Sequence, residues 1–281
     1  MKKIGIIGNP LGHSLSPQLH NAVIKKYGLN YCYEKWELKE DELSSFLHKV
    51  RESEDILGFN VTIPYKERIL KELDEVDERA RILGAVNTVT RIKGRLVGSN
   101  TDGPGFVKSL LSHHVTLKGA KILLLGSGGA ARGIALTLAQ LESKGIDIVA
   151  RNGEKGSNLA KEIVAMGTPS QYIPLEELAT LSLVGYQGII QTTPVGMKNK
   201  GSQLSFPFEM LTNKHFVVDI VYNPLETEFL KKARAQGSEV IQGLEMLVYQ
   251  GCLSFSQWTG LEGDPEYMLN LGRELLEVDH E

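Results

Sequence analysis

Two groups of residues in this sequence have types and spacing suited to chemistry, and the first is rich in glycine. Gly126-Ser127-Gly128-Gly129-Ala130-Ala131 directly follows the apolar run Ile122–Leu125, a G-x-G-x-x-A variant between a strand and a helix. In that setting Gly126 allows a tight turn and Gly128 lets the backbone approach a pyrophosphate, which the helix N-terminus attracts. The pattern predicts a dinucleotide site. The alternative is a turn that needs small residues only for packing.

The residues after the next expected strand indicate which dinucleotide would bind. NAD-binding proteins carry an acidic residue about 20 positions past the motif, whereas here the strand at 146–150 is followed by Arg151 and then Lys155. A guanidinium forks onto phosphate oxygens, so these charges suit a 2′-phosphate and favour NADP. Two solvated surface cations are the alternative, and Glu154, which lies between them, could pair with either one.

The second group lies in the first half of the chain and contains residues that exchange protons or bind polar ligands. Lys66 follows Pro64 at an expected helix start, where its charge opposes the helix dipole but suits proton exchange. Asn87 falls in an apolar strand, where an unpaired amide costs about 1 to 3 kcal/mol, so it needs a partner or a ligand. Asp102 lies at a helix entrance, where capping is the ordinary role.

Hydroxyl groups near two expected helix starts, at Pro17 and at Pro64, have both structural and functional interpretations. Ser16 stands before Pro17 and is expected to cap a helix, and Thr62 is a possible cap before Pro64. Ser14 has no such structural role. Each of these signals is weak when it is taken alone.

Short apolar runs alternate with helical periodicity along the chain, which predicts an α/β protein. In the first half we expect strands at 3–7, 31–37, 57–60 and 85–91, and helices at 17–27, 40–50, within 65–83 and from 101 toward 111. The second half opens as a doubly wound sheet, with strands at 122–125, 146–150, 188–191, 216–221 and 239–241. Helices at 244–258 and 265–276 follow.

These elements predict two domains with a functional cleft between them. Residues 1–102 and 243–281 would form an N-terminal α/β substrate-binding domain, and residues 103–242 a Rossmann-like, doubly wound NADP-binding domain. A cleft between two domains is a common place for a small-molecule site.

Composition narrows the class of partner. The 281 residues are 42% hydrophobic with a formal net charge of −3, so the chain folds by burial and has no positive field for nucleic acid or an anionic membrane. No run reaches the roughly 18 apolar residues of a membrane helix. Cys32 and Cys252 support neither a disulfide framework nor a zinc site, and the histidines show no ligand spacing, so we expect no metal and a reducing cytoplasm. A small-molecule substrate is therefore predicted.

Taken together, the motifs resemble those of the shikimate dehydrogenases. The blocks that carry the resemblance follow the family's order and are Gly12–Pro17, Asn60–Lys66, Gly84–Thr88, Asn100–Gly103, Gly126–Ala130, Asp219–Pro224 and Gly243–Gln250. The resemblance implies an NADP-linked, reversible reduction of 3-dehydroshikimate to shikimate.

The resemblance also implies a role for individual residues. Lys66 and Asp102 would be the acid–base pair at the reacting oxygen. The residues implied for the substrate's carboxylate and hydroxyls are Ser14, Ser16, Thr62, Asn87, Asp102, Tyr222 and Gln250. Those implied for the cofactor are Glu78, Gly126, Ser127, Gly128, Gly129, Ala130, Ala150, Arg151, Asn152, Lys155, Ile220 and Gly243.

Two segments depart from the family's usual pattern. Ala150-Arg151-Asn152 stands where Asn-Arg-Thr is usual, which keeps the arginine but changes both neighbours and bears on the strength of the NADP preference. Gln191 stands where asparagine is common, and we expect a small effect there.

Two other functions are compatible with the same scaffold. One is a quinate/shikimate dehydrogenase that tolerates NAD, against which Arg151 and Lys155 argue. The other is a catalytically silent NADP-binding regulator, against which the presence of Lys66, Asp102 and the serines together argues. The sequence is compatible with a monomer or a homodimer.

Overall fold

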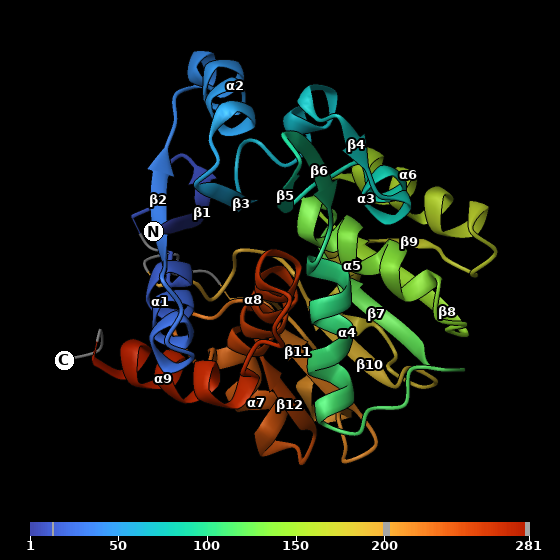
Figure 1. Cartoon of the computed structure of the whole chain (residues 1–281). Helices are drawn as coiled ribbons and strands as arrows, with labels where there is room; N and C mark the ends of the chain where they lie inside the picture. Colours follow the sequence, from blue (N-terminus) through green and yellow to red (C-terminus); the bar gives the residue numbers. More distant parts are fainter. Residues whose placement is uncertain (13, 199–202, 279–281) are drawn as a thin grey trace. The chain divides into compact units, whose positions relative to one another are not determined.

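The computed structural model describes residues 1–12, 14–198 and 203–278 (Figure 1). The chain forms two compact units, one made of residues 1–105 and 248–272 and the other of 106–247 with the described residues from Arg273 on. Each unit has its own six-stranded sheet. The predicted α/β class with a Rossmann-like half is confirmed.

The change from one unit to the other falls inside three helices. These are α4 (Asp102–Ser112), α8 (Gly243–Thr259) and α9 (Pro265–Val278), in which the residues from Arg273 on group with the second unit. The predicted domains instead changed at 102/103 and 242/243 and kept the whole C-terminus in the first. Helical periodicity is the same on both sides of such a change, so the sequence carries no mark of it.

The sheet of the first unit is mixed. Its strands lie in the order β2-β1-β3-β5-β6-β4, and their bounds are β1 Lys2–Gly8, β2 Tyr31–Glu37, β3 Ile56–Val61, β4 Glu75–Val76, β5 Thr88–Ile92 and β6 Arg95–Ser99. Strands β2, β1 and β3 are parallel, and β3, β5 and β6 pair antiparallel. The helices of this part of the chain are α1 Ser16–Lys26, α2 Leu43–Glu52 and α3 Glu78–Leu83.

The sheet of the second unit is entirely parallel, in the order β12-β11-β10-β7-β8-β9. Its strands are β7 Lys121–Leu125, β8 Gly145–Ala150, β9 Tyr172–Pro174, β10 Gly188–Gln191, β11 Phe216–Asp219 and β12 Glu239–Gln242, and its helices include α5 Gly129–Ala139, α6 Gly153–Ala165 and α7 Glu228–Ala235. The order reverses at β7 and β10, and the carboxyl ends beside such a reversal are where doubly wound sheets bind ligands.

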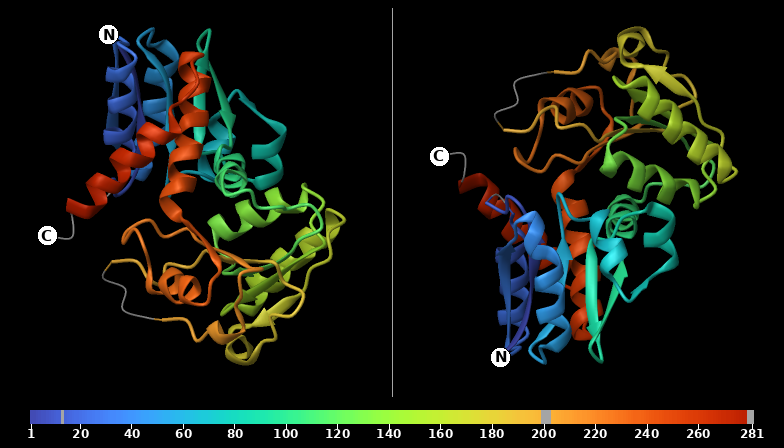
Figure 2. Two further views of the ribbon diagram at one scale, coloured as in Figure 1. Left: turned by 90° about the horizontal axis from the view of Figure 1, so that it is seen from below. Right: turned by 90° about the horizontal axis from the view of Figure 1, so that it is seen from above.

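The C-terminal part of the chain returns to the first unit. Lys26, at the end of α1, forms an ion pair with Asp264 and lies over the Tyr267 ring of α9 (Pro265–Val278), 4.6 Å from its centroid. Figure 2 shows the two helices side by side. Trp258 of α8 donates from Nε1 to the Val89 carbonyl oxygen of β5 at 3.0 Å, which attaches α8 to the sheet.

Some expected elements differ in the structure. The segment predicted as helical within 65–83 contains a short 3₁₀ turn at Arg68–Glu72, strand β4 and then α3. Hydrogen bonds from Asp74 to Leu96 and from Asp77 to Gly98 hold β4 beside β6. Such long-range pairing overrides local helical preference. The short edge strand β9 and the helices α6 and α7 were not predicted.

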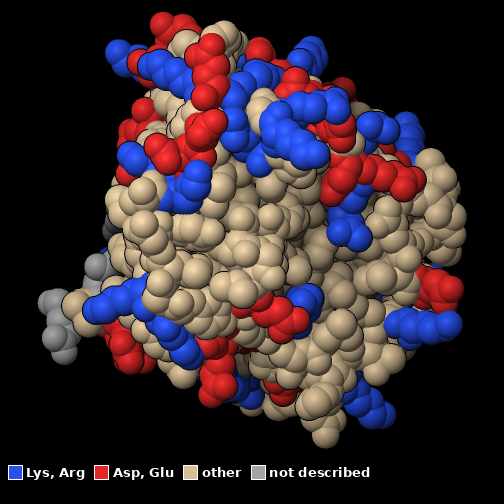
Figure 3. Space-filling model, in the orientation of Figure 1, with Lys and Arg blue, Asp and Glu red and all other residues tan. Residues whose placement is uncertain are grey.

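The surface carries both signs of charge. On the face shown in Figure 3, basic and acidic side chains are interspersed, with no large area of one sign. Within residues 1–12, 14–198 and 203–278, no helix combines the length and the apolar character needed to cross a membrane.

Candidate active site

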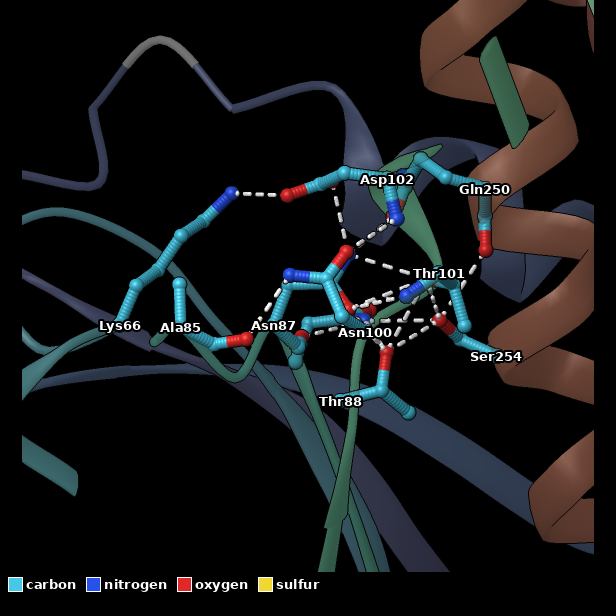
Figure 4. Close-up of polar contacts among 10 residues, drawn as sticks. Lys66, Ala85, Asn87, Thr88, Asn100, Thr101, Asp102, Gln250 and Ser254 are labelled. Atoms are coloured by element: carbon cyan, nitrogen blue, oxygen red, sulfur yellow. Dashed lines mark hydrogen bonds and ion pairs between the residues drawn. The ribbon is translucent and has the colours of Figure 1, made fainter. Parts of the chain in front are cut away.

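Lys66 and Asp102 form an ion pair in the first unit (Figure 4). Lys66 lies in the turn after β3, Asp102 is the first residue of α4, and Lys66 Nζ lies 2.6 Å from Asp102 Oδ2. Both side chains are partly exposed, Lys66 by 33% and Asp102 by 23%. A hydrogen-bonded amine and carboxylate that remain open to solvent can meet a substrate and exchange a proton with it.

The expected capping role of Asp102 is wrong. Asn100 Oδ1 accepts from the Asp102 backbone N–H at 3.0 Å, while Asn100 Nδ2 donates to the Ala85 carbonyl oxygen at 2.9 Å. Because Asn100 supplies the oxygen at the helix entrance, both carboxylate oxygens of Asp102 face other side chains.

The helix expected to begin at Pro64 is also absent, because residues 62–67 form turns and the first helical segment begins at Arg68. Lys66 therefore lies outside a first helical turn, and the argument from the helix dipole does not apply. Its backbone carbonyl accepts from the Val86 N–H at 2.8 Å, which holds the turn against the segment before β5.

Asn87 is the buried amide that the sequence left without a partner, and the structure supplies several. The side chain is 2% exposed. Its Oδ1 accepts from the Thr101 backbone N–H at 2.7 Å, and its Nδ2 donates to Asp102 Oδ1 at 2.7 Å. A backbone N–H can only donate, so the amide orientation is fixed and the nitrogen must face the carboxylate. Asn87 thus holds one oxygen of Asp102 while Lys66 holds the other.

Gln250 joins this group from α8. Asn87 Nδ2 lies 3.3 Å from Gln250 Oε1, and Gln250 is 9% exposed. The helices α4 and α8 approach closely here, since a Cβ on Gly105 would lie 2.5 Å from the Gln250 backbone nitrogen. Glycine at 105 is what permits this approach, so packing brings a residue from far along the chain beside Asn87.

The hydroxyls at the start of α1 do not match their expected structural role. Ser16 is the first helical residue, Leu15 occupies the cap position, and no side chain caps the helix. Ser16 is buried, and its backbone N–H donates to Ser14 Oγ at 3.4 Å. The prediction that Ser16 caps the helix is therefore wrong, and its side chain instead forms a hydrogen bond with Tyr33. Thr62 is half-buried in the turn after β3.

Tyr222 and Glu78 do not belong to the same unit as the residues with which they were grouped. Tyr222 belongs to the second unit, and burial raises the pKa of its phenol. Glu78 is exposed at the start of α3 in the first unit, where Asp77 caps the helix by accepting from Ala80 N at 2.6 Å. Their contacts with substrate and cofactor stay predictions.

The second unit has an open pocket at the carboxyl ends of β7, β8 and β10, enclosing about 1230 Å³ that includes open solvent. The predicted cofactor residues that line it are Gly126, Ser127, Gly128, Ala150, Arg151, Asn152 and Lys155. The prediction did not include the segment Thr192–Val195 or Leu175 and Leu204, which line it too. The rule that ligands bind outside the carboxyl ends of such strands would have indicated the segment after β10.

The glycine-rich turn suits a dinucleotide. Gly126 has φ +121°, and a Cβ there would lie 2.5 Å from Thr192 Oγ1, so only glycine fits. A Cβ on Gly128 or Gly129 would meet nothing within 4 Å, which leaves the backbone open to a ligand. Gly128 is the N-cap of α5 and has no side chain to satisfy the first N–H groups. The turn thus offers free donors to phosphate oxygens.

The cations beside the turn are free to meet a phosphate. Within the described ranges, Glu154 forms no ion pair with Arg151 or with Lys155, although either pairing was an alternative in the sequence. Asn152 Oδ1 accepts from the Lys155 backbone N–H at 2.9 Å and caps α6. Asparagine and threonine are both good N-caps, so the departure at 152 preserves the helix start that carries the lysine.

Other predicted cofactor residues have local packing contacts. A Cβ on Gly243 would lie 2.3 Å from the Ile220 carbonyl oxygen, so close backbone packing by itself requires this glycine. Gly129 and Ala130 form the start of α5. A cofactor contact at Gly129, Ala130, Ile220 or Gly243 stays a prediction.

Gln191 supports the pocket segment that follows β10. Its Nε2 donates to the carbonyl oxygens of Thr193 and Val195 at 3.1 and 2.9 Å, and it also lies 3.4 Å from Asp219 Oδ1. Asp219 accepts from Thr227 Oγ1 at 2.7 Å, and burial raises the pKa of its carboxyl to about 6. The longer side chain at 191 therefore braces the turn that lines the pocket.

Comparison with known proteins places these features in one family. Three family models match: the shikimate dehydrogenase substrate binding domain over residues 6–89, shikimate / quinate 5-dehydrogenase over 108–194, and the shikimate 5′-dehydrogenase C-terminal domain over 243–271.

Relatives that match over nearly their whole length indicate the same family as these models. The chain is 40% identical to the shikimate dehydrogenase (NADP(+)) of Desulforamulus reducens, covering 95% of this chain and 93% of the relative, and 42% identical to that of Geobacillus kaustophilus, covering 98% and 99%. The fold matches shikimate 5-dehydrogenase from Thermus thermophilus, solved with NADP(H) and shikimate, with a TM-score of 0.84 and 36% identity over 98% and 99% of the two chains. On the identity to these relatives over nearly its whole length, and on the shared fold, the chain belongs to the shikimate dehydrogenase family.

Proposed function

We propose that this protein catalyses the NADP-linked, reversible reduction of 3-dehydroshikimate to shikimate. The observation that carries the proposal is the Lys66–Asp102 pair, with Asp102 fixed by Asn87, in a chain whose curated relatives are named shikimate dehydrogenase (NADP(+)). A member of the family has been solved with both NADP(H) and shikimate. The pair supplies the acid and base that such a reaction needs.

The side chains proposed to bind the substrate suit a polyhydroxylated acid. Ser14, Ser16, Thr62, Asn87 and Gln250 all belong to the first unit, and all of them offer neutral hydrogen-bonding groups. Neutral donors and acceptors match hydroxyl groups one by one, and a buried group left unpaired by an analogue disfavours that analogue. These residues are proposed to bind the substrate's hydroxyls and carboxylate, together with Tyr222.

Lys66 is proposed to move the proton. When bound, NADPH supplies the hydride that reduces the ketone carbon, and NADP⁺ accepts it in the reverse direction. Lys66 delivers a proton from its ammonium group to the ketone oxygen, and as a neutral amine it takes the hydroxyl proton in the reverse direction. Asp102 Oδ2, 2.6 Å from Lys66 Nζ, holds the amine in place. General acid–base assistance of this kind contributes about 10² to 10⁴ in rate.

The pocket of the second unit is proposed to hold NADP. The N–H groups of the Gly126–Gly129 turn would bind the pyrophosphate, while Arg151 and Lys155 would bind the 2′-phosphate. Ser127, Ala150 and Asn152 line the same pocket, whereas Glu78, Ala130, Ile220 and Gly243 are proposed from the family resemblance alone.

Free cysteines at Cys32 and Cys252 fit a reducing cytoplasm, which we propose as the location.

The decisive experiment is an initial-rate assay of NADP⁺ reduction by shikimate, with quinate as second substrate and NAD⁺ as second cofactor. We expect turnover with shikimate and NADP⁺ to exceed the other three combinations. Quinate turnover with NAD⁺ at an equal rate would instead support the dual dehydrogenase that one family model's description includes. Binding of NADPH without any oxidation by 3-dehydroshikimate would support the silent regulator.

A further inference from the structure

The hydroxyl of Ser254 lies at the centre of a buried polar cluster beside the proposed site (Figure 4). Ser254 is 0% exposed and lies on α8, one turn after Gln250. Its Oγ lies 3.0 Å from Asn60 Nδ2, 2.8 Å from Thr88 Oγ1 and 3.1 Å from Thr101 Oγ1. Strands β3 and β5, the segment before α4 and helix α8 therefore meet at one side-chain oxygen.

The amide of Asn60 sets the direction of the first hydrogen bond. Asn60 Nδ2 lies 3.1 Å from the Asn87 backbone carbonyl oxygen, which can only accept. The amide oxygen consequently faces the Tyr33 hydroxyl at 2.8 Å. Burial raises the pKa of Tyr33 well above its usual value, opposed by a hydrogen bond from Ser16, so Tyr33 keeps its proton and donates it to Asn60. The remaining proton of Asn60 Nδ2 points to the Ser254 oxygen at 3.0 Å, with Thr88 Oγ1 at 3.2 Å as a longer second acceptor.

The second half of the cluster is oriented by a backbone N–H. The Asn87 amide oxygen faces the Thr101 N–H, so Thr88 Oγ1, 3.0 Å from that oxygen, donates its single proton to it. Thr88 then has no proton left for Ser254, and the 2.8 Å contact between them requires Ser254 to donate. The Gln250 carbonyl oxygen, at 3.1 Å, is a longer second acceptor for the serine.

We propose that Ser254 is a positioning residue for the reaction. Its hydroxyl accepts a hydrogen bond from Asn60 and donates one to Thr88. Thr88 in turn donates to Asn87 and holds it in the orientation that fixes Asp102. Hydrogen bonds in such a chain polarise one another, and a buried network in which every member is satisfied specifies one geometry. The inference rests on the proposed function, in which Asn87 and Asp102 contact the substrate. Ser254 acts through these neighbours and not on the substrate itself.

Helix α8 contains a matched control. Ser256 Oγ donates to the Cys252 carbonyl oxygen at 3.0 Å, as Ser254 Oγ lies 3.1 Å from the Gln250 carbonyl oxygen. Both serines therefore make the same bond to the preceding helical turn, but Ser256 makes none of the three contacts that link Ser254 to Asn60, Thr88 and Thr101. Replacing each by alanine separates support of the helix from support of the site.

The first test compares Ser254→Ala with Ser256→Ala. We expect Ser254→Ala to lower kcat/KM for shikimate by about tenfold and Ser256→Ala to change it by less than about twofold, because small misplacements of reacting groups carry large rate costs. Calorimetry without NADP gives a second readout, in which shikimate binds more weakly to Ser254→Ala only. Equal effects of the two substitutions, or a lower Tm for Ser254→Ala with unchanged kcat/KM and binding, would overturn the proposal.

The second test replaces Thr88, which keeps the proposal testable should Ser254→Ala fold poorly. Thr88→Val keeps the shape and removes the hydroxyl, whereas Thr88→Ser keeps the hydroxyl and removes a methyl group. We expect Thr88→Ser to stay within about threefold of wild type and Thr88→Val to lose about tenfold in kcat/KM. Packing alone gives the opposite order, because a buried β-branched side chain suits a strand.

A double-mutant cycle shows whether Ser254 and Thr88 act in one chain. The double variant Ser254→Ala/Thr88→Val should lose no more kcat/KM than the worse single variant, because either substitution breaks the same chain of hydrogen bonds. A loss in the double variant equal to the product of the two single losses would contradict a shared chain. Wild-type turnover with shikimate and NADP⁺ decides the proposed function by itself, whereas the ratios among variants decide the role of Ser254.

Discussion

At the scale of single residues, Lys66 gives the most direct test of proton transfer. Lys66→Ala should lower turnover by about 10² to 10⁴ and leave the shikimate dissociation constant nearly unchanged, since the amine acts mainly in the transition state. Lys71→Ala, an exposed lysine in the adjoining 3₁₀ turn, is the control. Measurements of kcat and of shikimate binding by calorimetry check this, and unchanged turnover would remove Lys66 from the mechanism.

Arg151 and Lys155 test the choice of cofactor. Alanine at either position should raise the KM for NADP⁺ by about tenfold and leave the KM for NAD⁺ within about twofold, because only NADP⁺ carries the phosphate that these cations would bind. Lys161→Ala is the control, since Lys161 lies on α6 with Lys155 but does not line the pocket. Equal rises for both cofactors would mean that the cations do not discriminate between them.

For other residues of the site, the sequence predicted some hydrogen-bonding roles correctly and others wrongly. Asn87 was predicted to need a partner because a buried unpaired amide is costly, and the structure confirms that it is fully paired. The predicted capping roles of Ser16 and Asp102 were wrong. Both predictions assumed that a polar side chain next to a helix start would bond to the free N–H groups of that helix. Asn100 met that need for α4, and α1 begins without a side-chain cap.

At the scale of elements, the approach of α4 and α8 makes a prediction about two helical glycines. Gly105→Ala should destabilise the protein by about 1 to 3 kcal/mol, because the new Cβ would lie 2.5 to 2.7 Å from Gln250 backbone and side-chain atoms. Gly133→Ala in α5, where a Cβ meets nothing within 4 Å, should instead stabilise it by about 0.5 to 1 kcal/mol. Thermal unfolding of both variants measures the two signs, and a stabilising Gly105→Ala would contradict the described packing.

The shikimate assay extends that prediction from packing to the site. Gly105→Ala should also lower kcat/KM, since Gln250 shifts with the backbone that the new methyl group displaces. Gly133→Ala, at a residue that does not line the pocket of the second unit, should leave kcat/KM within about twofold of wild type.

At the scale of the whole molecule, His113 makes folding stability depend on pH. Its Nδ1 lies 2.6 Å from Glu239 Oε1 of β12, and its Nε2 lies 2.8 Å from Glu245 Oε2 in the first turn of α8. Burial acts to lower the pKa of His113, but the hydrogen bonds and charges of the two carboxylates outweigh it, so the pKa is raised above 6.5. Both ring nitrogens can donate only in the imidazolium form.

The direction of the pH effect follows from that raised pKa. A group with a higher pKa in the folded state stabilises fully below its unfolded value, and the stabilisation is lost as the pH rises through the folded value. The difference in Tm between wild type and His113→Gln should therefore be largest at about pH 6 and shrink toward about pH 9. His48→Gln, which removes an exposed pair with Glu52, should show only a small difference in Tm. A difference that grew with pH would contradict the imidazolium bridge.

The sequence by itself determined the features that depend on neighbouring residues. The strand β7, the Gly126–Gly129 turn and the start of α5 follow one another along the chain, so apolar patterning and glycine spacing suffice to predict them. Strands β2 and β10 have the predicted bounds for the same reason. The family resemblance rests on motifs of this local kind.

Only the tertiary structure decided which polar groups share a hydrogen-bonded cluster. Asn60 and Ser254 are 194 residues apart in the chain, and Asn87 and Gln250 are 163 apart. Without tertiary contacts, Ser, Thr and Asn side chains can form hydrogen bonds with nearby backbone groups or with water, so local sequence does not select their partners. The packing of α8 against the first sheet and against α4 removes water from this region, so the buried groups must pair with one another, and that requirement selects Ser254 as their common partner.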